Sequence, residues 1–185
     1  MKTMTEHSKT KNELPVPEVL IDEKTLRSRI KEMGKEIMES YRDRHLTVIA
    51  VSNGATLFVA DLIRQLDIPL QLDSITAYSY EGTESSGDVM LFTQLKLDVK
   101  GRDILLVDDI LDTGRTMRKI IDYLESLNPE NIESCVLLDK PARRIVDIEA
   151  DYVGFEVADV FVVGYGLDYN EYYRNLPFVG KLNPA

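Results

Sequence analysis

The sequence lacks several features that would each define a class of protein. It holds a single cysteine, Cys135, so no disulfide can form within the chain, and we expect this residue to be buried in a protein of a reducing compartment. No uninterrupted apolar stretch reaches about 18 residues, which excludes a helix that spans a membrane. Residues 1–13 lack the apolar middle of a secretory signal, so we expect no membrane partner and a cytoplasmic location.

Positive charge is also scarce. The chain has 22 Lys and Arg against 32 Asp and Glu, which gives a formal net charge of -10. Proteins that grip the phosphates of nucleic acids use clustered basic side chains, so this composition argues against a nucleic-acid partner. An anionic ligand would have to be held locally, by backbone amides, a few well-placed cations or a metal ion.

The chain is long enough for one domain. Of its 185 residues, 44% are hydrophobic, enough for a sizeable core, and no internal repeat or low-complexity segment interrupts it. Residues 1–17 are polar and end with Pro15 and Pro17, so we predict a flexible tail followed by one domain over 18–185.

The apolar pattern predicts an α/β fold. Residues spaced by three and four positions predict helices over 22–41, from 56 to 65, and over 117–127 before Asn128-Pro129. Short apolar or β-branched runs predict strands at 48–51, 70–79, 89–95, 104–107, 136–138, 152–157 and 161–163. Such alternation is typical of a mainly parallel, twisted sheet flanked by helices, in which ligands collect beyond the carboxyl ends of the strands.

The most informative segment is 104–116, ILLVDDILDTGRT. We predict a buried strand that ends in Asp108 and Asp109, passes Asp112, and enters a helix through the loop 113–116. Gly114 allows a tight turn, and the free amides at the start of a helix favour a phosphate.

Three carboxylates stand within five residues of this segment. Two unit charges about 4 Å apart repel by roughly 4 kcal/mol at an effective dielectric of 20. A cation or sugar hydroxyls would relieve that repulsion, so the segment predicts a site for a phosphorylated sugar with Mg²⁺. A helix-capping cluster is the alternative, but capping explains one Asp and one Thr rather than all of them.

This segment resembles the phosphoribosyl-diphosphate signature of the type I phosphoribosyltransferases. The resemblance implies the fold of that family, with a small hood built from the chain ends. It also implies that Asp108 and Asp109 face the ribose hydroxyls and the metal. The loop Asp112, Thr113, Gly114, Arg115 and Thr116 would hold the 5-phosphate.

The rest of the chain resembles the 6-oxopurine branch of the family, the hypoxanthine(-guanine) phosphoribosyltransferases. The resemblance covers about 18–182 and rests on 138–144 (LDKPARR) and 153–177 (VGFEVADVFVVGYGLDYNEYYRNLP). It implies a purine salvage enzyme whose small-molecule substrates are a purine base and phosphoribosyl diphosphate. The products would be IMP or GMP and pyrophosphate.

Four residues receive purine-binding roles from this resemblance. Lys140 would donate to the 6-oxo group, Phe161 would stack on the ring, and the backbone of Val162 would read the base edge. Asp168 would lie beside the 2-position and join Asp108 and Asp109 as a metal ligand. Each residue alone has an ordinary structural explanation, and only their joint occurrence in this order favours a site.

The same resemblance supplies the remaining roles. Asp112 would take or hold the N7 proton while N9 attacks the sugar. Asn53, Gly54 and Arg174 would meet the leaving pyrophosphate, although the family often has lysine where this chain has Asn53. Ser79 and Tyr80 would begin a catalytic lid over 81–88.

Two other readings stay open from the sequence. One is a transferase for another base: Lys140, Phe161 and Asp168 argue against pyrimidines but do not exclude xanthine. The other is a regulatory protein that keeps the fold and senses nucleotides or RNA, against which the titratable Asp112 and the net charge both weigh. Family members commonly form homodimers or homotetramers, so we expect one of these assemblies.

Overall fold

The computed structural model of the chain describes residues 14–79, 89–91 and 95–183. The helices are α1 (Glu23–Tyr41), α2 (Thr56–Ile63), α3 (Arg115–Glu125) and the short 3-10 helix η1 (Pro141–Arg143). The strands are β1 (Glu18–Ile21), β2 (Leu46–Ser52), β3 (Gln71–Ser79), β4 (Val89–Leu91), β5 (Asp103–Leu111), β6 (Asn131–Asp139), β7 (Tyr152–Glu156), β8 (Val162–Val163) and β9 (Val179–Lys181).

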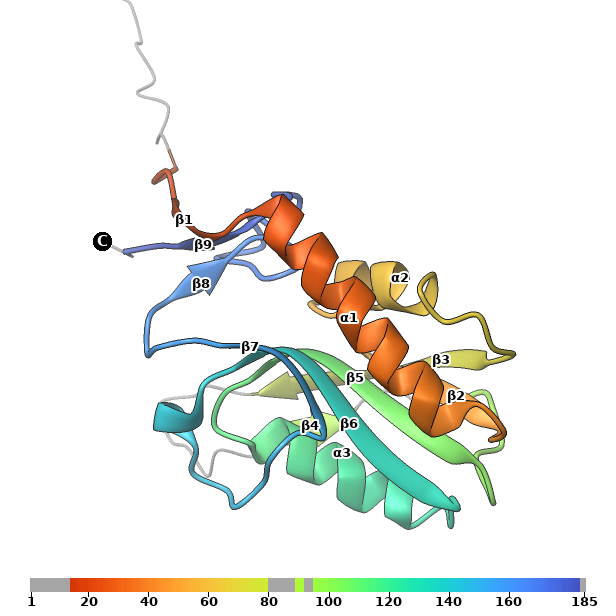
Figure 1. Cartoon of the computed structure of the whole chain (residues 1–185). Coiled ribbons are helices and arrows are strands. Elements are labelled where there is room, and N and C mark those ends of the chain that lie inside the picture. The colour runs from red at the N-terminus through yellow and green to blue at the C-terminus, as the bar shows by residue number, and fades with distance from the viewer. Residues whose placement is uncertain (1–13, 80–88, 92–94, 184–185) are drawn as a thin grey trace, which may run out of the picture.

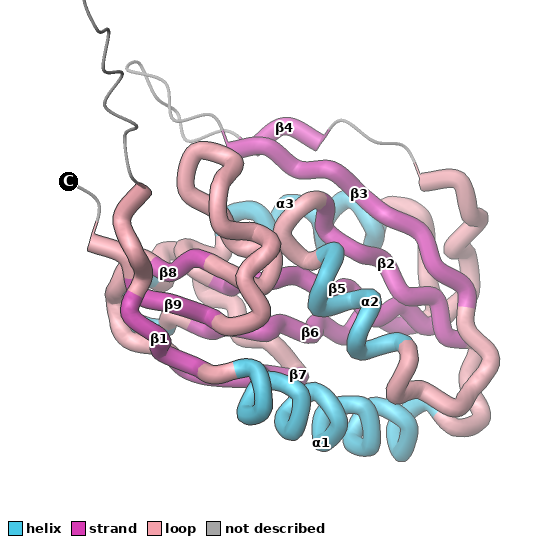
Figure 2. The backbone as a smooth tube through the Cα atoms, turned by 90° about the horizontal axis from the view of Figure 1, so that it is seen from above, coloured by secondary structure: helices cyan, strands magenta, loops and turns pink. Residues whose placement is uncertain are grey.

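The main sheet has the strand order β4-β3-β2-β5-β6-β7. Strands β3, β2, β5, β6 and β7 are parallel to their neighbours, and only β4 runs antiparallel, against β3. Helices α1 and α2 lie on one face of this sheet and α3 lies on the other, as Figures 1 and 2 show. The predicted α/β fold is therefore confirmed.

The two faces of the sheet are buried because the side chains of β5 alternate between them. Leu105 and Val107 pack in the core beneath α1 and α2. Ile104 and Leu106 pack in the second core with α3. Both faces are apolar, so β5 reads as a continuous hydrophobic run, which is the pattern of a strand covered by helices on both sides.

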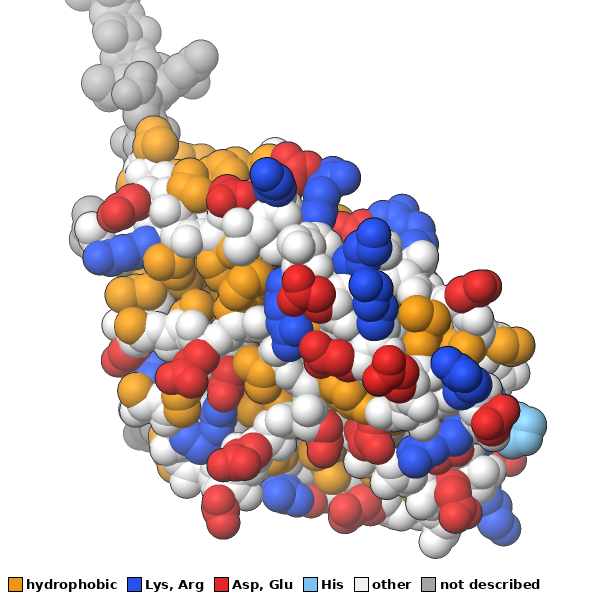
Figure 3. All heavy atoms as spheres, viewed as in Figure 1, with side chains coloured by type: hydrophobic (Ala, Val, Ile, Leu, Met, Phe, Trp, Pro, Cys, Tyr) orange, Lys and Arg blue, Asp and Glu red, His pale blue; other side chains and the backbone are white. Residues whose placement is uncertain are grey.

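Helix α1 forms where the predicted periodicity places it, and it buries one face through Leu26, Ile30, Met33, Ile37 and Tyr41. Its N-cap is Asp22, whose carboxylate accepts the amide of Thr25 at 2.9 Å. Arg29 donates to the carbonyl oxygens of Val153 and Gly154, which ties the helix to β7. On the face shown in Figure 3, acidic and basic side chains of the described residues are interspersed rather than gathered by sign.

A second, antiparallel sheet with the order β1-β9-β8 forms the hood. It joins the N-terminal strand β1 to β9 near the other end of the chain, and it lies beside the carboxyl ends of the main strands (Figure 1). The segment 161–163, predicted to be a strand, contributes β8 to this hood. Its partner there is β9, since Val162 is opposite Lys181 and Val163 is opposite Gly180.

Other boundaries differ from the prediction by a few residues. Helix α3 ends at Glu125, although Leu127 had extended the apolar pattern. The chain turns there, because Leu127 N donates to Leu124 O and Asn128 takes a left-handed φ of 57°. Helix α2 likewise ends at Ile63 rather than at Gln65.

The tail predicted over 1–17 lies mainly outside the described residues. Residues 14–17 have no regular secondary structure, and the carbonyl of Pro15 accepts a hydrogen bond of 2.7 Å from the Tyr173 hydroxyl. The boundary at residue 18 stays a prediction. In the described part of the chain, none of the helices combines the length and the apolar character needed to cross a bilayer.

Candidate active site

The acidic pair lies inside β5 rather than at its end. Strand β5 pairs with β2 only as far as Val107, opposite Ala50, but it continues beside β6 to Leu111. Asp108 and Asp109 therefore occupy the part of β5 that no longer has β2 beside it. This explains why a strand longer than expected still presents these carboxylates near the carboxyl edge of the sheet.

The pair is electrostatically costly as it stands. Asp108 is 7% exposed, and its carboxylate accepts the amide of Asp109 at 2.9 Å. Burial, followed by the charge of Asp109, raises the pKa of Asp108 well above its usual value. Burial also raises the pKa of Asp109. A cation beside these groups would favour their charged forms.

The loop from β5 to α3 is held from behind by the segment after η1. The carbonyl of Thr113 accepts the amides of Ile145 and Val146 at 3.0 and 3.1 Å. Gly114, the N-cap of α3, has φ 85°, and a Cβ there would lie 2.7 Å from Cγ2 of Ile148. Arg115 and Thr116 form the first turn of α3, so the amides at the start of this helix stand directly after Asp112.

A cavity of about 450 Å³ brings all four predicted purine-binding residues together. Its wall is built from the end of β5, the residues after β6, and the hood. It is lined by Asp109, Ile110, Asp112, Lys140, Arg143, Val160, Phe161, Val162, Leu167 and Asp168.

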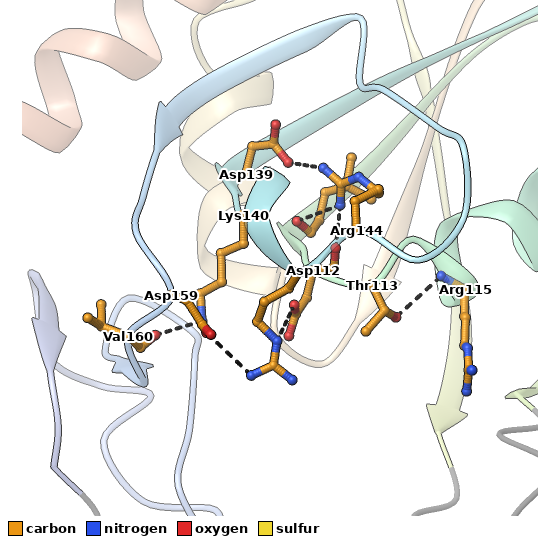
Figure 4. Close-up of polar contacts among 10 residues, drawn as sticks. Asp112, Thr113, Arg115, Asp139, Lys140, Arg144, Asp159 and Val160 are labelled. Atoms are coloured by element: carbon orange, nitrogen blue, oxygen red, sulfur yellow. Dashed lines mark hydrogen bonds and ion pairs between the residues drawn. The ribbon is translucent and has the colours of Figure 1, made fainter.

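Lys140 is buried in the wall of this cavity, although lysine side chains are rarely buried. It is 5% exposed, and its Nζ donates to the carbonyl of Val160 at 2.7 Å (Figure 4). Burial lowers the pKa of the ammonium below its usual value, while the charge of Asp112 opposes that effect. The ammonium thus stands near the carboxylate of Asp112.

The aromatic wall is more open. Phe161 is 43% exposed, and its ring meets that of Tyr169 edge-on, with centroids 5.6 Å apart and planes at 85°. Val162 is buried in β8, directly after Phe161. A large aromatic ring that remains partly exposed beside a polar cavity is available for stacking.

Arg174 is tied into the loop that carries Asp168. Its Nη1 donates to Gly166 O at 2.7 Å, and its Nη2 lies 2.8 Å from Asp168 Oδ1 and 3.1 Å from Glu171 Oε2. Gly166 has φ 103°, and a Cβ there would lie 2.1 Å from Gly54 O. This loop therefore packs directly against the segment that follows β2.

The segment after β2 reaches the acidic pair. A Cβ at Gly54 would lie only 1.8 Å from Asp109 Oδ2, so only glycine allows this approach. Asn53 beside it is exposed. Asn53, Gly54 and Arg174, which sequence reasoning grouped as pyrophosphate residues, thus belong to two segments in contact with each other.

The described residues do not by themselves form two predicted features, the metal site and the lid. No group of three or more His, Cys, Asp or Glu within 14–79, 89–91 and 95–183 could by itself hold a metal ion, so Asp108, Asp109 and Asp168 form no ready-made cage. Ser79 is the last residue of β3, and the rest of the predicted lid, from Tyr80 to 88, lies outside the described residues. Both assignments stay predictions.

Sequence reasoning missed two arginines of the site. Arg144 donates to Leu111 O at 3.0 Å, to Asp112 O, and to the carboxylate of Asp139, so it joins the ends of β5 and β6 (Figure 4). Arg143 lines the cavity, with its Nε 2.9 Å from Asp112 Oδ1. Their signal was present as two arginines shortly after Lys140, but nothing in a single sequence says that they turn back toward Asp112.

Comparison with known proteins places the chain in a family. The phosphoribosyl transferase domain model matches residues 20–170. A hypoxanthine-guanine phosphoribosyltransferase of Staphylococcus epidermidis is 46% identical over 165 residues, which cover 89% of this chain and 92% of that protein. A crystal structure of a hypoxanthine-guanine phosphoribosyltransferase from Bacillus anthracis superposes with a TM-score of 0.87 at 39% identity, covering 91% of this chain and 100% of that one.

A bifunctional protein TilS/HprT of Listeria monocytogenes is also 46% identical, over 170 residues. The match covers 91% of this chain but only 26% of that longer protein. The chain thus corresponds to about a quarter of the bifunctional relative.

The chain therefore belongs to the phosphoribosyltransferase family, a family of transferases. Within it, the chain belongs to the hypoxanthine(-guanine) phosphoribosyltransferase branch, because relatives that it matches over more than nine tenths of their length are hypoxanthine-guanine or hypoxanthine phosphoribosyltransferases.

Proposed function

We propose that the chain transfers the 5-phosphoribosyl group of phosphoribosyl diphosphate to N9 of hypoxanthine, and of guanine, in purine salvage. The products are IMP or GMP and pyrophosphate. The observation that carries this proposal is the single cavity lined by Asp112, Lys140 and Phe161, which adjoins the loop leading into α3. A base and a sugar phosphate bound there would be neighbours.

The base is selected by the wall of the cavity. An ammonium group donates hydrogen bonds and accepts none, so Lys140 favours a carbonyl oxygen at the purine 6-position over an amino group. Phe161 stacks on the ring, and the backbone of Val162 pairs with its edge. Asp168, which lines the same cavity, lies beside the 2-position.

Asp112 serves both halves of the reaction site. It stands between the cavity and the phosphate loop, and its carboxylate takes or holds the N7 proton as N9 attacks the anomeric carbon. Positioned acid–base groups of this kind contribute about 10²–10⁴ in rate. A lid that begins at Ser79 and Tyr80 would keep water from the positively charged sugar.

The sugar phosphate is held on the other side of Asp112. The 5-phosphate lies at the start of α3, against the amides and hydroxyls of the loop Thr113, Gly114, Arg115 and Thr116. Asp108 and Asp109 take the ribose hydroxyls. Asn53, Gly54 and Arg174 contact the pyrophosphate, for which a forked guanidinium is well suited.

Mg²⁺ is the proposed cofactor, and the residues present fit it. Two adjacent carboxylates with raised pKa values would be stabilised by a divalent cation. Mg²⁺ usually binds through one or two carboxylates together with substrate phosphates, so a complete protein cage is not required. Asp108, Asp109 and Asp168 are the proposed ligands, and the bound ion would neutralise charge on the departing pyrophosphate.

A cytoplasmic setting is proposed from the state of the single cysteine. The lone Cys135 is buried, and burial raises the pKa of its thiol, which suits a reducing cytoplasm. A homodimer or homotetramer is proposed from the family resemblance. Size-exclusion chromatography with light scattering would distinguish these assemblies from a monomer.

The direct test is an assay of the purified chain with Mg²⁺, phosphoribosyl diphosphate and one base at a time. We expect IMP from hypoxanthine and GMP from guanine, each with one pyrophosphate, and no product without Mg²⁺. Competition between hypoxanthine and xanthine in one reaction determines whether xanthine is also used. Tight nucleotide binding without turnover would instead support a regulatory binding protein.

A further inference from the structure

Arg143 lines the base cavity but has none of the roles proposed above for the transfer reaction. It is the last residue of η1, the short turn that begins with Pro141 directly after Lys140. This turn closes because Arg143 N donates to Lys140 O at 3.1 Å. The side chain is thereby placed on the wall of the cavity, beside the carboxylate of Asp112.

The guanidinium of Arg143 stands between two carboxylates. Its Nε lies 2.9 Å from Asp112 Oδ1, and its Nη1 lies 3.4 Å from Asp159 Oδ1. The contact with Asp112 is an ion pair without a hydrogen bond. The inner contact is more protected than the outer one, because the side chain of Asp112 is 35% exposed whereas that of Asp159 is 57% exposed.

Oδ1 of Asp112 needs such a partner. It is closed off from solvent, and among the described residues it is the one buried side-chain oxygen or nitrogen that lacks a hydrogen bond. A buried polar atom without a partner costs free energy, and more so when it carries charge. The Arg143 guanidinium is the positive group in contact with it.

Two consecutive arginines therefore hold Asp112 by different parts. Arg144 donates to its backbone carbonyl, and Arg143 pairs with its carboxylate. The Asp112 side chain is 35% exposed although Oδ1 is buried, so the exposure belongs to its other atoms. With Oδ1 against Arg143, Oδ2 remains for a ligand in the cavity.

We propose that Arg143 is a positioning residue of the transfer reaction, which fixes the Asp112 carboxylate so that Oδ2 meets the N7 edge of the purine. This inference rests on the proposed function. Arg143 acts through Asp112 and is not an acid or base itself, because a guanidinium keeps its proton throughout the physiological range. Asp159 restrains Arg143 from the solvent side and has the smaller effect.

The test compares four variants. Arg143→Met removes the charge and keeps the stem, Arg143→Lys keeps the charge, and Asp159→Asn removes the outer partner. Arg118→Met is the matched control, since Arg118 has a similar exposure of 41% and also faces a carboxylate, Asp122 at 3.9 Å, outside the cavity. For each variant, kcat and the KM of both substrates are measured, together with the melting temperature.

We expect Arg143→Met to lower kcat/KM for hypoxanthine about five- to tenfold, the range for a half-exposed charge contact. The KM for phosphoribosyl diphosphate should stay within about twofold. Arg143→Lys should recover part of the loss, Asp159→Asn should lose about twofold or less, and Arg118→Met should match the unaltered enzyme.

A second measurement isolates the N7 edge. The affinities of hypoxanthine and of 7-deazahypoxanthine, which has carbon at position 7, are compared in the presence of Mg²⁺ and pyrophosphate. Arg143→Met should weaken hypoxanthine and leave the deaza analogue unchanged. Equal weakening of both ligands, or unaltered kinetics in Arg143→Met, would overturn the proposal. If the unaltered chain shows no turnover, the proposed function fails, and the two affinities still decide whether Arg143 acts at position 7.

Discussion

The two halves of the candidate site are built in different ways. The proposed side for the ribose and its 5-phosphate is one continuous stretch, residues 108–116, that runs from β5 into α3. The base side is assembled from Lys140 and Arg143 after β6, Phe161 and Val162 at the hood, and Asp168 beyond it. Asp109, Ile110 and Asp112 belong to both, because they lie in that stretch and also line the base cavity. The comparison teaches that the proposed 5-phosphate site is local in the sequence, whereas the proposed base site depends on tertiary structure.

The two halves are also held by different forces. Backbone geometry holds the phosphate side, through the left-handed φ of Gly114 and the amides that Thr113 O accepts. Side chains hold the base side, as when Lys140 donates to Val160 O. A side-chain change should therefore affect base binding selectively, and a backbone change should affect phosphate binding selectively.

The largest effect should come from Asp112, where the two halves meet. We expect Asp112→Asn to reduce kcat by about 10²–10⁴, because the amide cannot take the N7 proton, while the fold is retained. Steady-state kinetics measure the loss, and circular dichroism with thermal melting checks the fold. Turnover at the normal rate in this variant would remove Asp112 from its proposed role.

Lys140 tests whether base binding can be weakened independently of phosphoribosyl-diphosphate binding. Lys140→Ala should weaken hypoxanthine binding roughly 10- to 100-fold, the range for a lost hydrogen bond to a charged group, and change phosphoribosyl-diphosphate binding far less. Calorimetric titration of each ligand measures both constants. Lys140→Met, which fills the buried stem, controls for lost packing. Equal losses for the two ligands would contradict the assignment of Lys140 to the base.

Gly114 tests the phosphate side. Gly114→Ala should raise the KM for phosphoribosyl diphosphate about five- to tenfold, because the strained φ of 85° and the contact with Ile148 displace the loop. Gly101→Ala is the matched control: its φ is 65°, but a Cβ there has nothing within 4 Å. Both variants should lose about 1–3 kcal/mol of stability. A raised KM in both would show that general strain is the cause.

The smallest effect on activity should come from Asp73, which belongs to neither half. Its carboxylate accepts the amides of Ser74, Lys96 and Leu97 at 2.8, 2.7 and 3.0 Å. Burial alone would raise the pKa of Asp73, but these donors lower it below its usual value. Asp73→Asn should cost about 1–3 kcal/mol of unfolding free energy at neutral pH and leave kcat unchanged.

The pH dependence of that loss follows from the sign of the shift. A carboxyl with a depressed folded-state pKa stabilises the fold above its unfolded pKa of 3.8, and the contribution disappears as the pH falls through the folded value. Urea unfolding of both proteins at pH 7 and near pH 3 measures this. A stability difference that persists unchanged at the lower pH would contradict the role given to the three amides.

Much of the fold could be predicted from the sequence, because helices and strands are indicated by local patterns of apolar residues. The apolar runs gave the parallel strands, and the periodicity of 22–41 gave α1, beginning one residue later than predicted because Asp22 is its N-cap. The pairing of β1 with β9 is not local, and no pattern within either strand specifies the other. For the same reason, the apolar run 161–163 predicted a strand but not its pairing with β9.

The candidate site shows the same difference between local features, which the sequence predicts, and non-local ones, which it does not. The contiguous residues Asp108 to Thr116 could be grouped from their spacing alone. The burial of Lys140 and the contacts of Arg143 and Arg144 with Asp112 depend on how β6 and η1 lie beside β5, which spacing does not reveal. The sequence indicated Asp108 and Asp109 as candidate site residues. It did not indicate their position inside β5, because that position depends on where β2 stops pairing.

A crystal structure of the chain soaked with IMP is the most direct test of the claim that both halves serve one ligand. We predict the phosphate at the loop 113–116, the ribose beside Asp108 and Asp109, and hypoxanthine between Lys140 and Phe161. Clear density for the nucleotide anywhere else, or with its ends reversed, would contradict the account.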